Sequence, residues 1–171
     1  ILLSFFSPSG YEIRKDYDLA DQVIYMPLDT LANARKLLDS FTIKAAFFIK
    51  YEFWFNHLKV LQQKGIPVFY FSVRFRDNQH FFKSYGGWFN QHLSAVEHFF
   101  VQDKHSADLL KSIGITQFSL AGDTRFDRVA KIAAKAEPIS AIEQFISGRK
   151  CIIAGSTWPP DENLLLDMLP D

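Results

Sequence analysis

The sequence predicts an α/β domain with a mostly parallel sheet, of the Rossmann-like class. Short apolar runs alternate with amphipathic stretches along the 171 residues, an order typical of repeated β-α-β units. The run Ala45–Ile49 is apolar throughout, as in a strand whose two faces are both covered. A hydrophobic content of 48% excludes a disordered chain and is enough for a sizeable core.

Each predicted strand is a short apolar run that ends at a polar or turn-forming residue. The predicted strands are Ile1–Phe6, Gln22–Met26, Ala45–Ile49, Val68–Ser72, His98–Gln102, Phe118–Ala121 and Lys150–Ala154. Helical spacing of apolar residues predicts the segments between them to be helices, which together imply a sheet covered on both faces. The predicted helices begin near Tyr11, Asp29 (as N-cap), Phe55, Phe81, Lys104, Phe126 and Asp161, and Ala141–Ile146 is predicted to be a connector. Gly86 and Gly87 should break or kink the helix expected over Phe81–Val96.

Right-handed crossovers bring the carboxyl ends of parallel strands to one edge of the sheet, where open α/β sheets bind ligands. Polar residues follow nearly every predicted strand. The sequence therefore predicts one polar edge. Its members are Ser7–Gly10, Lys50–Glu52, Arg74, Arg76, Asp103, Asp123–Arg125 and Ser156–Thr157.

Composition excludes several classes of protein. The 19 basic and 19 acidic residues cancel, so no net field favours nucleic acid. The single cysteine, Cys151, excludes an internal disulfide and zinc sites of the cysteine-histidine type. No apolar run is long enough to span a bilayer. The dinucleotide, P-loop, zinc-protease and hydrolase-elbow motifs are absent, and the scattered histidines show no metal-ligand spacing.

Arginines and hydroxyls are the main candidates for ligand binding at the polar edge. Arg74, Arg76 and Arg125 suit an anionic substrate because guanidinium binds phosphate or carboxylate through two hydrogen bonds. The alternative, salt bridges to neighbouring acids, is equally favoured for any single arginine. Ser156 and Thr157 could hold a phosphate at a helix start, or could simply cap that helix.

Two aromatic segments add further candidates. Glu52, next to Trp54, could accept a proton from a substrate hydroxyl or amine, although a structural role at a helix start is the favoured reading of periodicity alone. The second segment is predicted to contact lipid or a partner, because its aromatics cannot all face one core. Its members are Phe81, Phe82, Tyr85, Trp88 and Phe89; core packing is the commoner role of any one of them.

The strand-end segments together resemble a known family, the transferases of 3-deoxy-D-manno-octulosonic acid (Kdo). Ser7–Gly10 is similar to the family's T-x-T-G-type turn, and Lys50–Trp54 is similar to its E-x-E-x-W segment. Ser72–Arg76 resembles its N-A-R-L-S strand end. Ala121–Asp127 resembles G-N-x-K-F-D, and Gly155–Glu162 resembles S-T-H-x-G-E-E. Each motif alone is weak, but five in order at compatible spacings are fairly specific.

Some positions depart from the family pattern. Lys50 stands where the first Glu of E-x-E-x-W is expected, Arg125 replaces a Lys, and Trp158 replaces a His. The resemblance implies that the family's catalytic Glu, in a G-E motif, lies upstream of Ile1, so no catalytic residue is expected in this fragment. It also implies a truncated acceptor-binding domain over residues 1–148 and the start of a donor-binding domain over 149–171.

The resemblance implies the N-terminal half of a glycosyltransferase of the B fold that moves Kdo from CMP-Kdo to a lipid A precursor, lipid IVA. It implies an inverting reaction without metal or cofactor, at the cytoplasmic face of the bacterial inner membrane, by a parent protein whose fragment is soluble and inactive alone. The implied acceptor-binding residues are Ser9, Gly10, Glu52, Arg74 and Arg76. The implied donor-cleft residues are Arg125, Ser156, Thr157 and Glu162.

Two alternatives remain open from the sequence. Another glycosyltransferase of the same fold could use a different nucleotide sugar. A non-catalytic Rossmann-like module could bind an anion or a protein through the aromatic segment.

Overall fold

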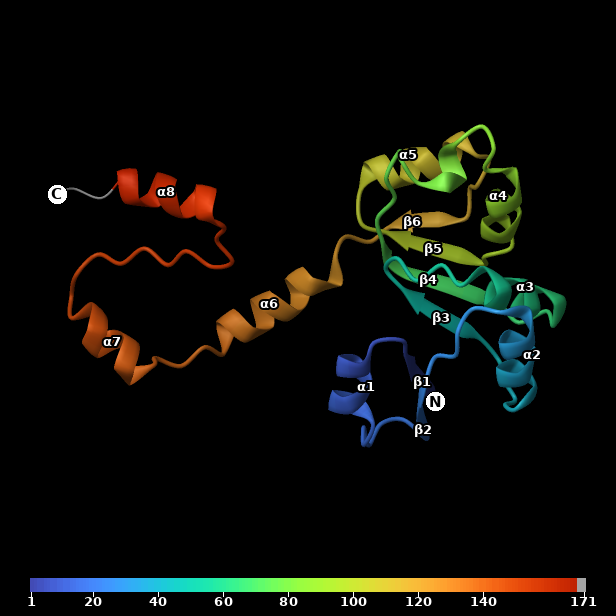
Figure 1. The fold of residues 1–171 in the computed structure, drawn as a ribbon, viewed down its shortest axis with the longest axis horizontal. Coiled ribbons are helices and arrows are strands. Elements are labelled where there is room, and N and C mark those ends of the chain that lie inside the picture. Colours follow the sequence, from blue (N-terminus) through green and yellow to red (C-terminus); the bar gives the residue numbers. More distant parts are fainter. Residues whose placement is uncertain (169–171) are drawn as a thin grey trace. The chain divides into compact units, whose positions relative to one another are not determined.

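The computed structural model describes residues 1–168 and divides into two compact units (Figure 1). The first unit is Ile1–Asp127, and the second begins at Arg128. The first unit contains every strand found in residues 1–168. It therefore contains the predicted edge residues from Ser7 to Arg125, whereas Ser156, Thr157 and Glu162 belong to the second unit.

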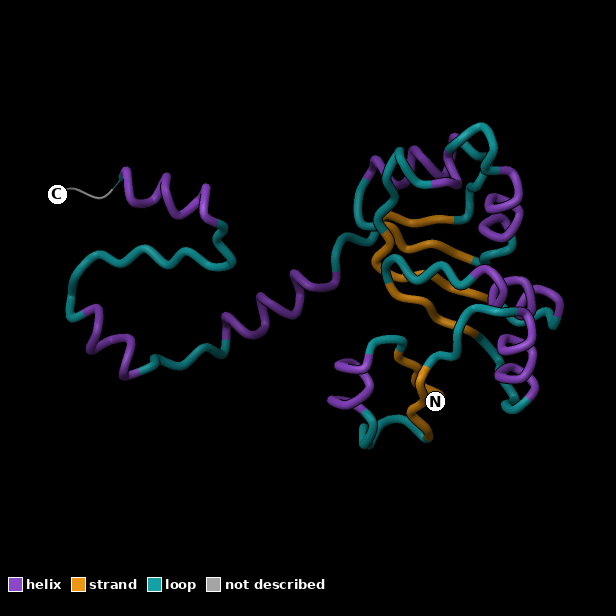
Figure 2. The backbone as a smooth tube through the Cα atoms, in the orientation of Figure 1, coloured by secondary structure: helices purple, strands orange, loops and turns teal. Residues whose placement is uncertain are grey.

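Strands and helices alternate through the first unit, as predicted (Figure 2). Its strands are β1 Leu2–Phe5, β2 Gln22–Tyr25, β3 Ala46–Ile49, β4 Val68–Val73, β5 His98–Val101 and β6 Phe118–Leu120. Its helices are α1 Pro8–Arg14, α2 Leu31–Asp39, α3 Phe55–Gln63, the 3₁₀ helix η1 His80–Phe82, α4 Gly87–Ser94 and α5 Lys104–Ser112. Helix α6, Thr124–Ala134, runs from the first unit into the second.

Every strand pair is parallel, which confirms the α/β, Rossmann-like fold class. The strands form two sheets rather than one, with orders β1-β2 and β3-β4-β5-β6. In the larger sheet Ala46 pairs with Val68 and Phe99 pairs with Phe118. Within residues 1–168, one edge of β1 and one edge of β3 have no strand partner.

The hydrophobic core lies on one face of the four-stranded sheet. Tyr70 and Phe99 point into it, and helices α2 to α5 all contribute buried residues to the same cluster. Successive right-handed crossovers in one direction place their helices on a single face, which explains this arrangement. The opposite face carries Phe47 and Ile49, whose side chains are 63% and 61% exposed. The prediction of a sheet covered on both faces is therefore wrong for the first unit.

Two helix starts differ from the prediction because of their caps. Helix α1 begins at Pro8 rather than Tyr11: the Ser7 hydroxyl accepts the Gly10 N–H at 3.1 Å, and proline suits the first helical position. Thr30, not Asp29, caps α2 through the Asn33 N–H at 3.2 Å. The Asp29 carboxylate instead accepts hydrogen bonds from the start of α3.

The predicted helix over Phe81–Val96 is interrupted, as the glycine pair suggests. Helix η1 ends at Phe82, and α4 begins at Gly87. Gly86 lies over the carbonyls of η1, where a Cβ would come within 2.3 Å of the His80 oxygen and 2.8 Å of the Phe81 oxygen. The backbone can take this path only without a side chain at residue 86.

The second unit contains helices only, within residues 128–168. They are the remainder of α6, α7 Ser140–Ile146 and α8 Pro159–Asp167. Residues 141–146, expected to connect elements, are part of α7. The strand predicted over Lys150–Ala154 is not formed; Ile152 and Ile153 are exposed and have no strand partner in the described chain. Within residues 1–168, no helix is both long and apolar enough to cross a membrane.

The close approach at Gly86 generates a stability prediction. Gly86→Ala should lower the free energy of unfolding by about 1–3 kcal/mol, because the added methyl group overlaps backbone carbonyls that cannot move cheaply. Gly87→Ala is the matched control, since a Cβ there meets nothing within 4 Å. Urea unfolding of both variants measures the difference; equal stabilities would contradict the packing at Gly86.

Candidate functional site

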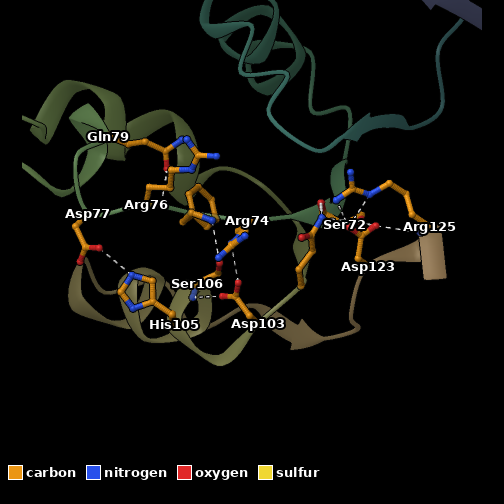
Figure 3. Close-up of polar contacts among 12 residues, drawn as sticks. Ser72, Arg74, Arg76, Asp77, Gln79, Asp103, His105, Ser106, Asp123 and Arg125 are labelled. Carbon is orange, nitrogen blue, oxygen red and sulfur yellow. Dashed lines mark hydrogen bonds and ion pairs between the residues drawn. The ribbon is translucent and has the colours of Figure 1, made fainter. Parts of the chain in front are cut away.

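The carboxyl ends of β3 to β6 gather a set of polar side chains at one edge of the sheet (Figure 3). Lys50 and Ser72 have left-handed backbones, with φ of 62° and 55°. The pairing register of β4 with β5 shifts between Phe71 and Val73, so Ser72 forms a bulge. Bulges of this kind turn a side chain away from the regular alternation, and Ser72 is aimed at the strand ends.

Ser72 is the centre of a hydrogen-bond network that links three strand ends. The Gln102 amide donates to the Ser72 carbonyl at 2.8 Å and to its hydroxyl at 3.1 Å. The Ser72 hydroxyl lies 3.5 Å from an Asp123 oxygen, at the limit of a hydrogen bond. These contacts hold the carboxyl end of β4 against the residues that follow β5 and β6.

Asp123 and Arg125 form a close ion pair beside this network. The Arg125 backbone N–H donates to Asp123 at 3.0 Å and the Arg125 Nε donates at 2.8 Å, while one terminal guanidinium nitrogen also contacts the carboxylate. Hydrogen bonds from Arg125, with a smaller contribution from Lys50, lower the pKa of Asp123 to about 2. The same pairing raises the pKa of Arg125. The charge of Arg125 is therefore partly offset within the protein.

Arg74 is also paired, but less completely. Its Nε lies 3.1 Å from Asp103, which caps α5 by accepting the Ser106 N–H at 2.7 Å. Partial burial opposes ionisation of Asp103, but the hydrogen bonds from Ser106 and the charge of Arg74 outweigh it and lower its pKa. The buried Ser106 hydroxyl accepts the Phe75 N–H at 2.8 Å, which fixes the segment that carries Arg74.

The third arginine, Arg76, begins a tight turn next to a small cavity. Its backbone N–H donates to the Gln79 side-chain oxygen at 2.9 Å. Tyr51, Arg76, Asn78 and Gln79 line a solvent-open cavity of about 270 Å³. Nearby Asp77 binds His105 at 2.9 Å, and this hydrogen bond lowers the pKa of Asp77.

Glu52 lies in the loop after β3, tied to the core by its backbone. The Tyr70 hydroxyl donates to the Glu52 carbonyl at 3.0 Å, and burial first, then the charge of Glu52, raises the pKa of that phenol. The Glu52 carboxylate accepts a hydrogen bond from the Trp54 indole at 2.8 Å. Glu52 thus combines an exposed carboxylate with a fixed backbone position.

Asp29 joins the segment after β2 to the start of α3. Its carboxylate accepts the Asn56 and His57 N–H groups at 3.1 and 3.2 Å and lies 2.7 Å from the His57 ring. Helix α3 has no side-chain cap of its own, so Asp29 supplies the acceptor that its first turn needs.

The predicted residues of α1 lie in its first turn. Ser9 is exposed, and its hydroxyl is 3.4 Å from that of Ser7. A Cβ on Gly10 would come within 2.8 Å of the Phe5 ring, so glycine there permits close packing of α1 on β1. The acceptor role of Ser9 and Gly10 stays a prediction.

The predicted lipid-contact segment separates into buried and exposed members. Phe81 is in the core, against Phe53 and Phe75, so it cannot contact lipid in this conformation. Phe82 and Phe89 are half-buried against the same core. Only Tyr85 and Trp88 remain exposed, at 65% and 55%. Sequence spacing did not predict which of these aromatics are buried, because η1 and α4 are two separate elements and do not share one helical periodicity.

In the second unit, the Thr157 hydroxyl donates to the Glu162 carboxylate at 3.0 Å. Ser156, with φ of 60°, precedes it. Helix α8 begins with Pro159 and Pro160, which carry no N–H, and the Asp161 N–H is bound to the Trp158 carbonyl at 2.8 Å. Phosphate binding here would therefore depend on hydroxyls rather than on helix-start amides.

Three contributors to the edge were missed by sequence reasoning: Tyr70, Gln102 and the Asp29–His57 contact. Gln102 had a signal, since it is the polar residue that ends an apolar strand. No sequence signal identifies Tyr70, because the acceptor of a tyrosine hydroxyl in a buried strand cannot be predicted from the sequence. The structure brings Arg74, Arg76, Arg125 and Glu52 to strand ends of the same sheet, as the sequence predicts.

The fold and this edge define a Rossmann-like α/β protein with cationic and amide groups at the position where open sheets bind ligands. A family model described as 3-Deoxy-D-manno-octulosonic-acid transferase (kdotransferase) matches residues 1–128. The chain belongs to this Kdo transferase family, and its domain implies a glycosyltransferase. A search of curated proteins finds no match to the chain.

The Asp123–Arg125 pair generates a prediction on pH dependence. Because the folded-state pKa is about 2 and the usual value is near 4, the pair should stabilise the fold above about pH 4 and lose that contribution as the pH falls toward 2. Carboxyl ¹³C NMR should give an Asp123 midpoint near 2, which Arg125→Gln should move up toward the usual value. A midpoint near 4 in the unsubstituted chain would contradict the pairing.

Proposed function

We propose that this chain forms the acceptor-binding part of a transferase that moves Kdo from CMP-Kdo to a lipid A precursor such as lipid IVA. The observation that carries the proposal is the group of arginines at the carboxyl edge, within the segment that the family model matches. Lipid A precursors carry phosphates, and guanidinium groups are well suited to bind them.

On the acceptor side, the proposal assigns phosphate binding to Arg74 and Arg76 and sugar contacts to Glu52, Ser9 and Gly10. Arg74 uses one nitrogen on Asp103 and keeps its other donors exposed to solvent. Glu52 is held at a fixed distance from the core by Tyr70, which suits an acceptor for a sugar hydroxyl. This surface lies within the proposed acceptor domain, residues 1–148, of a B-fold glycosyltransferase.

On the donor side, the proposal assigns Arg125 to the cleft and Ser156, Thr157 and Glu162 to contacts with the nucleotide sugar. Asp123 engages the Nε and one terminal nitrogen of Arg125, and this orients the remaining terminal nitrogen for a donor carboxylate or phosphate. Residues 149–171 are proposed to begin the donor-binding domain.

The proposed reaction is an inverting displacement. A carboxylate takes the proton of the acceptor hydroxyl, whose oxygen bonds to the anomeric carbon of Kdo as the bond to the CMP phosphate breaks. Such general-base assistance is typically worth about 10²–10⁴ in rate. The proposal assigns this carboxylate to the glutamate of the family's G-E motif, which has no counterpart in residues 1–171. Positive groups offset charge that develops on the departing CMP.

A membrane-facing position at the cytoplasmic side of the bacterial inner membrane belongs to the same proposal. Tyr85 and Trp88 are exposed, and the exposed Lys83 precedes them in the same segment; such aromatic and basic groups suit an interface with anionic lipid. The buried Phe81 is not part of this surface.

The proposal is tested by a transfer assay with the full-length parent protein, CMP-Kdo and lipid IVA, run beside the 171-residue chain. We expect transfer by the parent and none by this chain alone. Arg74→Ala in the parent should raise the KM for lipid IVA by about tenfold, the usual range for a lost charged hydrogen bond, and leave the KM for CMP-Kdo unchanged. Arg35→Ala, an exposed arginine on α2, is the control for charge loss.

Donor competition separates this proposal from its alternative. A parent that prefers another nucleotide sugar over CMP-Kdo would contradict the Kdo assignment. Transfer by the 171-residue chain alone would contradict the proposed location of the base.

A further inference from the structure

The cavity lined by Tyr51, Arg76, Asn78 and Gln79 has the properties of an anion subsite. Its lining comes from two neighbouring loops, after β3 and after β4, so it lies on the carboxyl edge. Its volume of about 270 Å³ is just below the range of about 300–1,000 Å³ for drug-sized ligands. A single monosaccharide with one charged group is a better match to this size than a nucleotide sugar.

Arg76 differs from the other two edge arginines in its charge balance. Arg74 is paired with Asp103, and Arg125 is paired with Asp123. No carboxylate lies within 4 Å of the Arg76 guanidinium among the described residues 1–168. The carboxylate of adjacent Asp77 contacts the His105 ring at 2.9 Å rather than the Arg76 guanidinium. Among the described residues, Arg76 therefore brings to the cavity a guanidinium that has no carboxylate partner.

The turn that carries Arg76 also fixes a second donor. The Gln79 side-chain oxygen accepts the Arg76 N–H at 2.9 Å, and the Gln79 N–H donates to the Arg76 carbonyl at 3.1 Å (Figure 3). With its oxygen engaged, the Gln79 amide has its NH₂ group left for a ligand. The Asn78 amide lines the same cavity. Guanidinium and amide donors together suit the oxygens of a phosphate or carboxylate.

Tyr51 supplies the apolar wall of the cavity. Its ring is exposed and lines the cavity together with the turn that carries Arg76. An aromatic face beside charged donors suits a pyranose ring, which presents C–H groups on one face and a charged substituent on another.

We propose that this cavity binds a pyranose that carries a phosphate monoester, with the phosphate on Arg76, Asn78 and Gln79 and the sugar ring on Tyr51. The choice of a phosphorylated sugar rests on the proposed function; the anion chemistry of the cavity does not. The subsite would hold one phosphorylated sugar of the acceptor and would thereby fix the position of the acceptor along the carboxyl edge.

The test is a ¹⁵N NMR titration of the 171-residue chain with glucosamine 1-phosphate, inorganic phosphate and neutral glucosamine. Glucosamine 1-phosphate should shift the side-chain amides of Asn78 and Gln79. Arg76→Gln should weaken its affinity about tenfold or more, and Arg76→Lys should give an intermediate loss because the charge stays but the paired donors do not. Arg35→Gln, on α2, should leave the affinity unchanged.

Tyr51→Ala should reduce the affinity for glucosamine 1-phosphate to that for inorganic phosphate. Equal affinities of the unsubstituted chain for these two ligands would overturn the sugar contact, and equal affinities for glucosamine and its phosphate would overturn the anion contact. Unchanged binding by Arg76→Gln, or shifts away from residues 51 and 76–79, would overturn the site. A parent that binds the sugar phosphate through Arg76 but does not transfer Kdo would contradict the proposed function alone.

Discussion

The loop after β3, at the edge of the sheet, is fixed to the core by one hydrogen bond, between the Tyr70 hydroxyl and the Glu52 carbonyl. The Tyr70 ring is fully buried and stacks on Phe48, Phe53 and Phe99, so its position is set by packing on both neighbouring strands. Because the ring is fixed, the hydroxyl that binds the loop after β3 is also fixed in position. The core thereby determines where the loop that contains Tyr51 and Glu52 lies.

The three arginines of the edge differ in whether a carboxylate binds them, and we expect them to differ in role for this reason. Asp123 orients Arg125 and Asp103 orients Arg74, at the cost of part of their attraction for an anion. Arg76 has no such carboxylate partner within residues 1–168. Two of the three edge arginines are therefore held in place by a carboxylate, and the third is the one to which we assign the phosphate of the proposed subsite.

The parallel α/β architecture could be predicted because apolar runs and helical spacing are local signals. Their arrangement in two sheets, and the bare face with Phe47, could not, because both depend on strand neighbours far apart in sequence. Strand-end positions predicted the edge arginines, but not which of them carry a carboxylate partner. Phe81 was misassigned because η1 and α4 pack on the core separately, and sequence spacing does not show which residues of each turn inward.

The most direct test of this account is hydrogen exchange in the Tyr70→Phe variant, which keeps the stacked ring and removes only the hydroxyl. The Phe53 N–H, bonded to the Tyr51 carbonyl at 3.0 Å, reports on the loop after β3. We expect it to exchange about fivefold faster, the effect of losing about 1 kcal/mol, while the Ile66 N–H at the end of α3 is unchanged. Unchanged exchange at Phe53 would contradict the claim that Tyr70 fixes this loop.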